Sequence, residues 1–136
     1  MYSSLSDGEK FCLRWNELEA NLSSAVRDLR DNKELFDLTL ACDDDQHIQV
    51  HRVVLSASSS FFRNLLRRLP HHHPLIYLKG IRQTDLQAVL SFIYNGEVNI
   101  AQQDLSSFLV VNFHFLFQNT KTFQCRWRRK TSRSRD

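Results

Sequence analysis

Residues 36–62 decide the fold of this chain, and they read FDLTLAC at 36–42, DDDQ at 43–46 and HIQVHRVVLSASSSFF at 47–62. Apolar and polar side chains alternate in the first stretch, and the same two-residue period resumes at the start of the third. That period is typical of strands with one buried face. The acidic stretch between them is long enough for a hairpin turn and too charged for a core. We therefore expect two antiparallel strands, followed directly by a helix from Arg52.

The segment upstream of the hairpin begins with three large apolar residues at alternate positions, Phe11, Leu13 and Trp15. This alternation predicts a short strand with all three side chains on one side. A strand so close to the amino terminus needs the edge of another strand to pair with. The sequence alone leaves open whether that edge belongs to the same chain or to a second copy.

A helix is expected over about 16–30. Asn16 can accept the free amides of the first turn, and Glu19 lies three residues later, as in a capping box. Leu18 and Leu22 begin a row of apolar residues at helical spacing. The pattern predicts an amphipathic helix with one face buried.

The elements after the hairpin alternate between helices and short strands. Thr84 with Gln87 repeats the capping-box pattern, and Gly96 is expected to end the same helix. The expected order is a helix over 52–58, a helix over 61–68 capped by Ser59 or Ser60, a buried strand over 75–78, a helix over 84–95, a strand over 98–100 and a helix over 102–111. This order predicts an α+β fold, in which a small, mostly antiparallel sheet packs on a cluster of helices.

Composition is that of one globular domain. The chain has 136 residues, 42% of them hydrophobic and 24% charged, which is sufficient for a single core. No segment approaches the ~20 apolar residues of a membrane span, so we expect no membrane partner. The formal net charge of the chain is +3. Its last eleven residues carry six basic side chains and one acidic one, a net charge of +5, so the rest of the chain has a net charge of −2. Attraction to polyanions is therefore expected only from this end.

Four motifs, in the same order, resemble the tramtrack-type branch of the BTB/POZ domain. The family carries an F-x-L-x-W-N opening, a D-V-T-L-A-C strand, an A-H-(K/R)-x-V-L-S-A segment and a G-E-V-N turn. The matching residues are Phe11-Cys12-Leu13-Arg14-Trp15-Asn16, Asp37-Leu38-Thr39-Leu40-Ala41-Cys42, His51-Arg52-Val53-Val54-Leu55-Ser56-Ala57 and Gly96-Glu97-Val98-Asn99-Ile100. The resemblance covers roughly residues 10–109 and implies the BTB/POZ fold.

The resemblance also implies a homodimer. In the family, the amino-terminal strand of one subunit pairs with the short strand after the G-E-V-N turn of its partner, and the first long helix packs against its mate across a two-fold axis. Pairing within one chain is the alternative. The interface expected for exchange comprises Phe11, Leu13, Trp15, Leu18, Leu22, Val98 and Ile100.

A charged pocket is implied at Asp37, His51 and Arg52. In related domains the acid and base equivalent to Asp37 and Arg52 lie at the floor of a groove lined by both subunits. There a desolvated ion pair fixes geometry more than it adds stability. An ordinary salt bridge at the end of a strand, contributing about 0–1 kcal/mol, is the alternative. His51 is expected to order the start of its helix.

The end of the chain departs from the family. We divide the chain into a flexible segment over 1–9, the BTB/POZ domain over 10–110 and a divergent tail over 111–136 that we expect to be poorly ordered. Phe113, Phe115 and Phe117 alternate like a strand. The basic end is expected either to be a solvated tail or to bind nucleic acid or direct nuclear import, through Arg126, Arg128, Arg129 and Lys130.

Metal binding and catalysis lack their motifs. His71, His72 and His73 adjoin one another, but no two cysteines lie at the spacing of a zinc site. The chain has only three glycines and shows no G-x-S-x-G elbow, phosphate-binding loop or H-E-x-x-H motif. We expect no metal, no cofactor, no small-molecule substrate and no enzymatic activity.

The function implied by the resemblance is a protein–protein interaction module of a nuclear transcription regulator. Its expected partners are a second copy, related BTB proteins and transcriptional co-regulators, and its expected location is the nucleus. The alternative is a substrate adaptor of a cullin-based ubiquitin ligase, for which the altered end at 110–136 is unfavourable. A third hypothesis is direct nucleic-acid binding by the basic tail.

Overall fold

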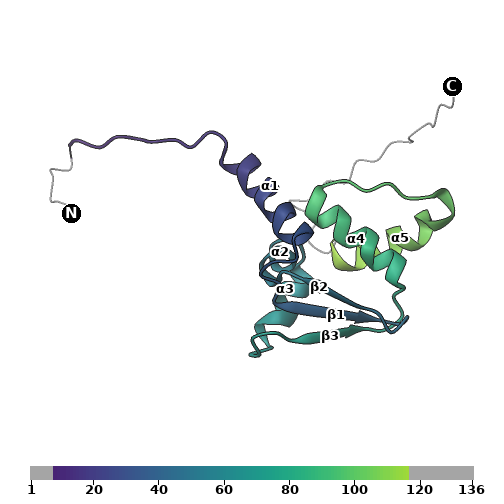
Figure 1. Ribbon diagram of the computed structural model, residues 1–136. Coiled ribbons are helices and arrows are strands. Elements are labelled where there is room, and N and C mark those ends of the chain that lie inside the picture. The colour runs from purple at the N-terminus through teal and green to yellow at the C-terminus, as the bar shows by residue number, and fades with distance from the viewer. Residues whose placement is uncertain (1–7, 117–136) are drawn as a thin grey trace, which may run out of the picture.

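A computed structural model describes residues 8–116, which form an α+β domain (Figure 1). Helices and strands alternate along this part of the chain much as the sequence predicts. The elements are α1 (Leu18–Asp31), β1 (Leu38–Cys42), β2 (His47–Val50), α2 (Arg52–Ser58), α3 (Ser60–Arg67), β3 (Leu75–Leu78), α4 (Gln83–Asn95) and α5 (Gln102–Phe115). No helix within residues 8–116 combines the length and the apolar character of a membrane span.

The sheet has the order β2-β1-β3 and is mixed. β1 and β2 form the expected antiparallel hairpin, with Leu38 opposite Val50. β3 pairs with β1 in parallel, with Leu40 beside Ile76, because α2 and α3 carry the chain back across the sheet between these strands. The prediction of a fully buried third strand is wrong: Leu75 and Tyr77 are exposed, since the helices cover only one face of the sheet.

The core lies between the sheet and the helices. Leu38, Leu40 and Val50 of the hairpin are at most 1% exposed. Helices contribute the rest of the cluster, including Phe62 of α3 and Phe115 of α5, whose ring centroids lie 5.0 Å apart. Full burial of such side chains stabilises the fold by roughly 1.5–3 kcal/mol each. The hydrophobic contacts of one chain therefore suffice to define this domain.

Two of the predicted helix ends are confirmed. Ser59 is the N-cap of α3, and its Oγ accepts a hydrogen bond from the Phe62 amide at 3.2 Å. The same hydroxyl donates to the carbonyl of Phe115 at 2.6 Å, which fastens α5 to the start of α3. Gly96 ends α4 with φ 82°, a left-handed conformation that favours glycine.

The two predicted capping boxes are wrong. Helix α1 begins at Leu18, so Asn16 lies outside its first turn and no side chain caps it. Helix α4 begins after Arg82, and its first amide, on Gln83, donates instead to Asp44 Oδ2 at 3.1 Å. The acidic hairpin turn thus caps a helix that follows 39 residues later. A tertiary contact has replaced the local motif, because a free amide accepts any carboxylate that the fold brings near it.

The carboxyl-terminal part of the described chain is helical. Phe115 is 1% exposed and Phe113 is 60% exposed, because residues two positions apart lie on different sides of helix α5. The prediction of a strand is therefore wrong for these two residues, and Phe117 lies outside the described residues. The strands expected over 10–15 and 98–100 are also absent from the single chain.

Candidate functional site

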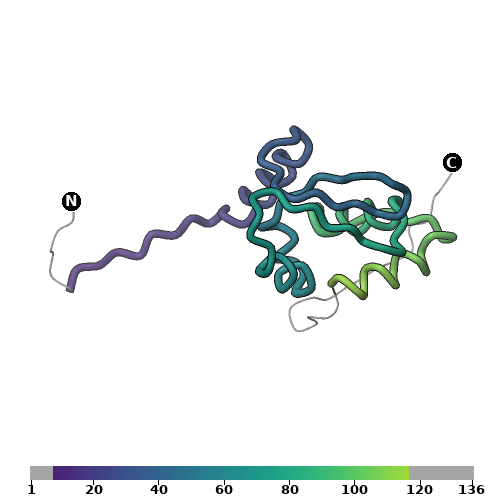
Figure 2. Tube along the Cα trace, turned by 90° about the horizontal axis from the view of Figure 1, so that it is seen from below, coloured from purple at the N-terminus to yellow at the C-terminus, as the bar shows by residue number. Residues whose placement is uncertain are grey.

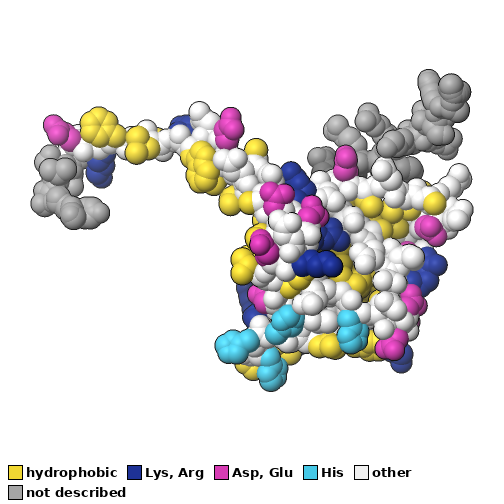
Figure 3. All heavy atoms as spheres, in the orientation of Figure 1, with side chains coloured by type: hydrophobic (Ala, Val, Ile, Leu, Met, Phe, Trp, Pro, Cys, Tyr) yellow, Lys and Arg dark blue, Asp and Glu magenta, His cyan; other side chains and the backbone are white. Residues whose placement is uncertain are grey.

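The amino-terminal arm, residues 8–15, extends away from the domain (Figures 1 and 2). Phe11 is 89% exposed, Leu13 is 92% exposed and Trp15 is 62% exposed. Figure 3 shows hydrophobic side chains along this projection, without any neighbouring element against them. The arm therefore exposes three large apolar side chains that no other part of residues 8–116 covers, and exposed apolar surface of this size is typical of an interaction site.

Helix α1 continues the same exposed surface. None of its 14 residues is buried, and Leu18 and Leu22 are 38% and 55% exposed. The prediction of one buried face is therefore wrong for the single chain. Only the second half of the helix packs on α4, where the Arg30 guanidinium lies 4.7 Å from the centre of the Tyr94 ring. The first half keeps its apolar face open.

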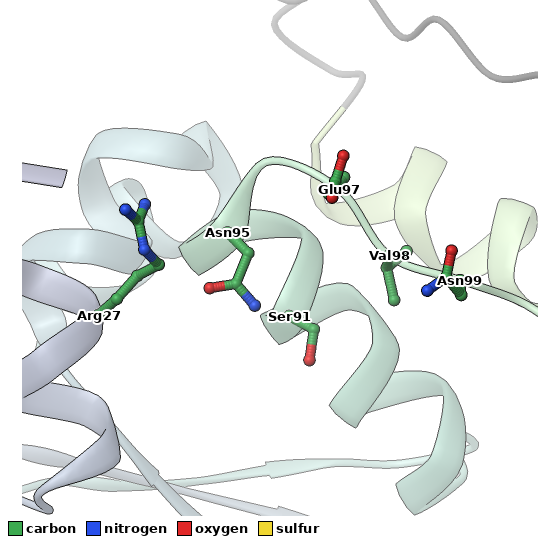
Figure 4. A pocket seen from close by; sticks show the side chains of 6 residues that line it. All are labelled: Arg27, Ser91, Asn95, Glu97, Val98 and Asn99. Carbon is green, nitrogen blue, oxygen red and sulfur yellow. The ribbon is translucent and has the colours of Figure 1, made fainter. Parts of the chain in front are cut away.

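A cavity of about 510 Å³ lies between α1, the end of α4 and the loop that follows α4 (Figure 4). Val98 and Ile100 are half-buried against the core, although they form no strand. Their segment pairs with no strand among residues 8–116 and lies beside the cavity, and we call it the open edge. The residues that line the cavity are Arg27, Ser91, Asn95, Glu97, Val98 and Asn99. The polar members on α1 and α4 could not be predicted from the sequence, because their proximity depends on how the two helices pack.

The predicted ion pair between Asp37 and Arg52 does not form. Asp37 Oδ1 instead accepts the backbone amide of Arg52 at 2.7 Å, at the first residue of α2. The Arg52 guanidinium turns away and donates through Nη1 to the carbonyls of His71 and His72, at 3.3 and 3.4 Å. Within residues 8–116 the ion pairs belong to Arg82, with Asp85 and Asp104. The bond to the helix amide satisfies the carboxylate without immobilising the long arginine side chain against it.

Asp37 and Arg52 nevertheless line a groove of about 360 Å³ between α2 and α3. Three arginines and two aliphatic side chains contribute to the groove. Its lining residues are Asp37, Arg52, Val53, Ser56, Arg63, Leu66 and Arg67. The contribution of α3 could not be predicted from the sequence, because nothing in the spacing shows that this helix places Arg63 and Arg67 near Arg52.

His51 is not part of this groove. It is 5% exposed, and its ring bonds Tyr94 Oη through Nδ1 and the Glu34 carbonyl through Nε2, each at 2.7 Å. Since a carbonyl can only accept, Nε2 carries the proton and Nδ1 accepts from the tyrosine. Tyr94 Oη also accepts the His51 amide at 3.0 Å. His51 therefore joins the connection between α1 and β1 to α4. It stands at the N-cap of α2, but its side chain accepts no amide of that helix, so its role in ordering the start of α2 stays a prediction.

Burial raises the pKa of Tyr94 above its ordinary value. The hydrogen bond from the His51 amide and the nearby Arg30 act in the opposite direction. The hydroxyl is therefore held in its protonated form, which is the form that donates to Nδ1.

The acidic turn binds the end of β3 and the residues that follow it. Asp43 Oδ1 accepts from the Tyr77 hydroxyl and from the Gly80 amide, both at 2.9 Å. The amide, and after it the hydroxyl, lower the pKa of Asp43, and the same bond raises the pKa of Tyr77. Within residues 8–116 no three His, Cys, Asp or Glu side chains are grouped so that they could hold a metal ion.

An exposed aromatic arm, an uncovered helix face and an arginine-bordered groove define a protein-interaction domain. The chain belongs to the BTB/POZ domain family, whose model matches residues 26–129. The basic tail residues Arg126, Arg128, Arg129 and Lys130 lie outside the residues that the structure describes.

Relatives from Drosophila melanogaster share this domain. The chain is 48% identical to Broad-complex core protein isoforms 1/2/3/4/5 over 105 residues, which cover 77% of this chain and 14% of that protein. It is 44% identical to Longitudinals lacking protein-like, over 77% of this chain and 82% of the relative. It is 40% identical to the alpha isoform of Protein tramtrack, over 76% of this chain and 12% of that protein. The chain thus corresponds to one domain of much longer proteins and to most of a short one.

Solved structures agree on the fold. The BTB domain of zebrafish PATZ1 matches with a TM-score of 0.68 and 14% identity, over 82% of this chain and 90% of that one. The BTB domain of human Gigaxonin matches with a TM-score of 0.67 and 20% identity, over 82% and 91%. The α+β assignment and the family assignment are therefore confirmed.

Proposed function

We propose that the chain is the homodimerising module of a nuclear transcription regulator, and that its two copies exchange their amino-terminal arms. The supporting observation is a 14-residue helix without a buried side chain, preceded by an arm whose three large apolar residues are 62–92% exposed. The arm of one copy pairs with the open edge at Val98 and Ile100 of the other. The exposed half of α1 then packs against its mate.

A single chain leaves several large apolar side chains in contact with water. Full burial of each large apolar side chain contributes roughly 1.5–3 kcal/mol. Phe11, Leu13, Trp15 and Leu22 on each of two copies therefore provide at most about 12–24 kcal/mol, against a cost of association of about 4–15 kcal/mol. Exchange also closes the open edge beside the cavity. A two-fold arrangement uses the same surface twice, as most homodimers do.

The regulatory part of the proposal follows from the family resemblance. We propose that the dimer brings together related BTB proteins and recruits co-regulators by protein contacts in the nucleus. A substrate adaptor of a cullin-based ubiquitin ligase is the alternative. Co-precipitation with a cullin would favour the adaptor, whereas co-precipitation with nuclear BTB proteins in the absence of a cullin would favour the regulator.

The dimer is tested by size exclusion coupled to light scattering. The full chain is expected to have the mass of two copies at micromolar concentration. Leu22→Asp is expected to shift the mass to one copy, because it places a charge at the centre of the proposed contact. Leu75→Asp is the matched control, because both leucines are 55% exposed and Leu75 lies on the sheet. A single-copy mass for the unmodified chain would contradict the proposal.

A further inference from the structure

The arm has a basic side opposite its apolar side. It is extended (Figure 2), and successive side chains of an extended segment point to opposite sides. Lys10 and Arg14 therefore lie opposite the three large apolar side chains, and no acidic residue of the arm shares their side. Both are exposed, and neither side chain has an ion pair or a hydrogen bond with any of residues 8–116.

The open edge alternates in the same way. Val98 and Ile100 are half-buried against the core, whereas Glu97 and Asn99 are exposed. Glu97 is the one charged residue of this segment, and its carboxylate has no ion pair among residues 8–116. Arg27, the other charged residue that lines the cavity, lies on its opposite side (Figure 4). The open edge therefore carries one uncompensated negative charge.

Pairing of the arm with the open edge determines which sides meet. The apolar side of the arm must turn toward Val98 and Ile100, since a slip of one residue would return all three of its large side chains to water. The basic side then lies on the same face as Glu97. Side chains directly opposite each other in such a pair are about 4.5–5.5 Å apart at Cβ, and long side chains also reach the diagonal neighbour at about 7–8 Å.

The spacing of the two basic residues makes the contact independent of the exact register. Every position on the basic side of the arm is Lys10 or Arg14, or lies two residues from one of them. Glu97 is therefore opposite or diagonal to a basic side chain in every register that keeps the apolar side inward. Opposite charges at such positions stabilise the pair of strands, and like charges destabilise it.

We propose that Glu97 of one copy pairs with Lys10 or Arg14 of the other, and that this contact selects the partner. The proposal rests on the exchange of arms proposed above and adds the charge by which an arm accepts or rejects an edge. Charges at the rim of an interface discriminate between partners more than they add affinity. The preferred partner is thus a BTB domain with an acidic residue in its open edge, a second copy of this chain among them.

The test uses two variants of the full chain with opposite charge changes. Glu97→Lys makes the open edge basic, and Lys10→Glu combined with Arg14→Glu makes the arm acidic. Each variant alone is expected to self-associate roughly three- to tenfold more weakly than the unmodified chain, because like charges meet at both edges of the dimer. A mixture of the two restores opposite charges at both edges. The mixed dimer is therefore expected to match the affinity of the unmodified dimer within about twofold.

Native mass spectrometry, with one variant isotope-labelled, counts the mixed dimers. The control pair is Glu34→Lys with a chain that carries Arg68→Glu and Lys79→Glu, which repeats the same charge changes at exposed positions outside the arm and the open edge. This pair is expected to mix statistically. The preference of the first pair for mixed dimers is expected to shrink as ionic strength rises from about 0.01 to 0.15 M, since the Debye length falls from about 30 to about 8 Å.

The outcomes separate this proposal from the dimer itself. Statistical mixing of the first pair, or an equal preference in the control pair, would overturn the selecting contact and leave the dimer standing. Mixed dimers no tighter than either variant alone would overturn it as well, because charges that meet only within one chain cannot be restored by a second. A single-copy mass for the unmodified chain would refute the dimer and the contact together.

Discussion

Leucines of the same size behave differently in two regions of this molecule. Leu38 in β1 is fully buried between the sheet and the helices, whereas Leu22 in α1 is 55% exposed. The hairpin, α3, α4 and α5 bury their apolar residues against one another within one chain. The apolar residues of the arm and of the first half of α1 are not covered by any other part of residues 8–116. The comparison indicates that the core makes the domain fold, whereas the amino-terminal region carries the exposed apolar surface that we propose a second copy covers.

The largest expected difference between the two regions is in stability. Leu38→Ala is expected to lower the free energy of unfolding by about 2–5 kcal/mol, because it leaves a cavity in the core. Leu22→Ala is expected to change it by less than about 1 kcal/mol at protein concentrations where the chain is monomeric. Urea denaturation of both variants checks this. Equal destabilisation would mean that α1 is part of the core of each chain.

The core contains one polar residue that weakens it. Asn112 on α5 is fully buried, and neither Nδ2 nor Oδ1 has a hydrogen-bond partner among residues 8–116. Asn112→Leu is expected to raise the free energy of unfolding by about 1–3 kcal/mol, since an unsatisfied buried amide costs that much. Thermal unfolding measures the change. A lower midpoint would show that the amide has a partner in solution.

Tyr94 of α4 bonds His51, which in turn bonds the carbonyl of Glu34 in the connection between α1 and β1. Tyr94→Phe removes the hydroxyl that bonds His51 through both its ring and its amide. The loss of stability is expected to be about 1–3 kcal/mol, because two buried groups of His51 lose their partner. Chemical denaturation near neutral pH checks this. Tyr77→Phe serves as the control, because it also removes a tyrosine hydroxyl, on an exposed residue of β3 whose hydroxyl bonds Asp43.

The same hydroxyl gives a dependence on pH. The pKa of Tyr94 is raised in the folded chain, so the unfolded chain loses this proton at a lower pH, near the ordinary value of about 10. The stability contributed by the group is therefore complete below pH about 10 and is lost as pH rises through the folded pKa. Denaturation midpoints at a series of alkaline pH values are expected to fall more steeply for the unmodified chain than for Tyr94→Phe. Parallel curves would contradict this role.

The smallest expected effect concerns the cap that the hairpin turn provides. Asp44→Ala leaves the first amide of α4 without its acceptor, and the expected cost is about 0.5–2 kcal/mol. Asp45 lies in the same turn but has φ 61°, a left-handed conformation in which alanine would be strained. Asp45→Asn is therefore the control, because asparagine tolerates this conformation and the substitution leaves Asp44 in place. Equal losses for Asp44→Ala and Asp45→Asn would exclude the cap.

Sequence predicted the elements that depend on neighbouring residues. The hairpin, α2, the Ser59 cap and the Gly96 end follow from periodicity and turn chemistry, and the structure confirms them. Contacts between distant residues could not be predicted in this way. Asp44 caps α4 across 39 positions, and Arg63 reaches the groove only because of the way α3 packs beside α2. The resemblance identified the family, but it also suggested an ion pair between Asp37 and Arg52. In the structure Asp37 accepts the backbone amide of Arg52 instead.

The most direct test of the exchanged arm is amide hydrogen exchange over residues 9–15 at increasing protein concentration. The account predicts that these amides become protected as the concentration rises, since the arm gains hydrogen bonds only when a second copy offers its edge at Val98 and Ile100. Protection of β1 is expected at every concentration. Arm amides that exchange freely at all concentrations, in a chain whose β1 remains protected, would contradict the account.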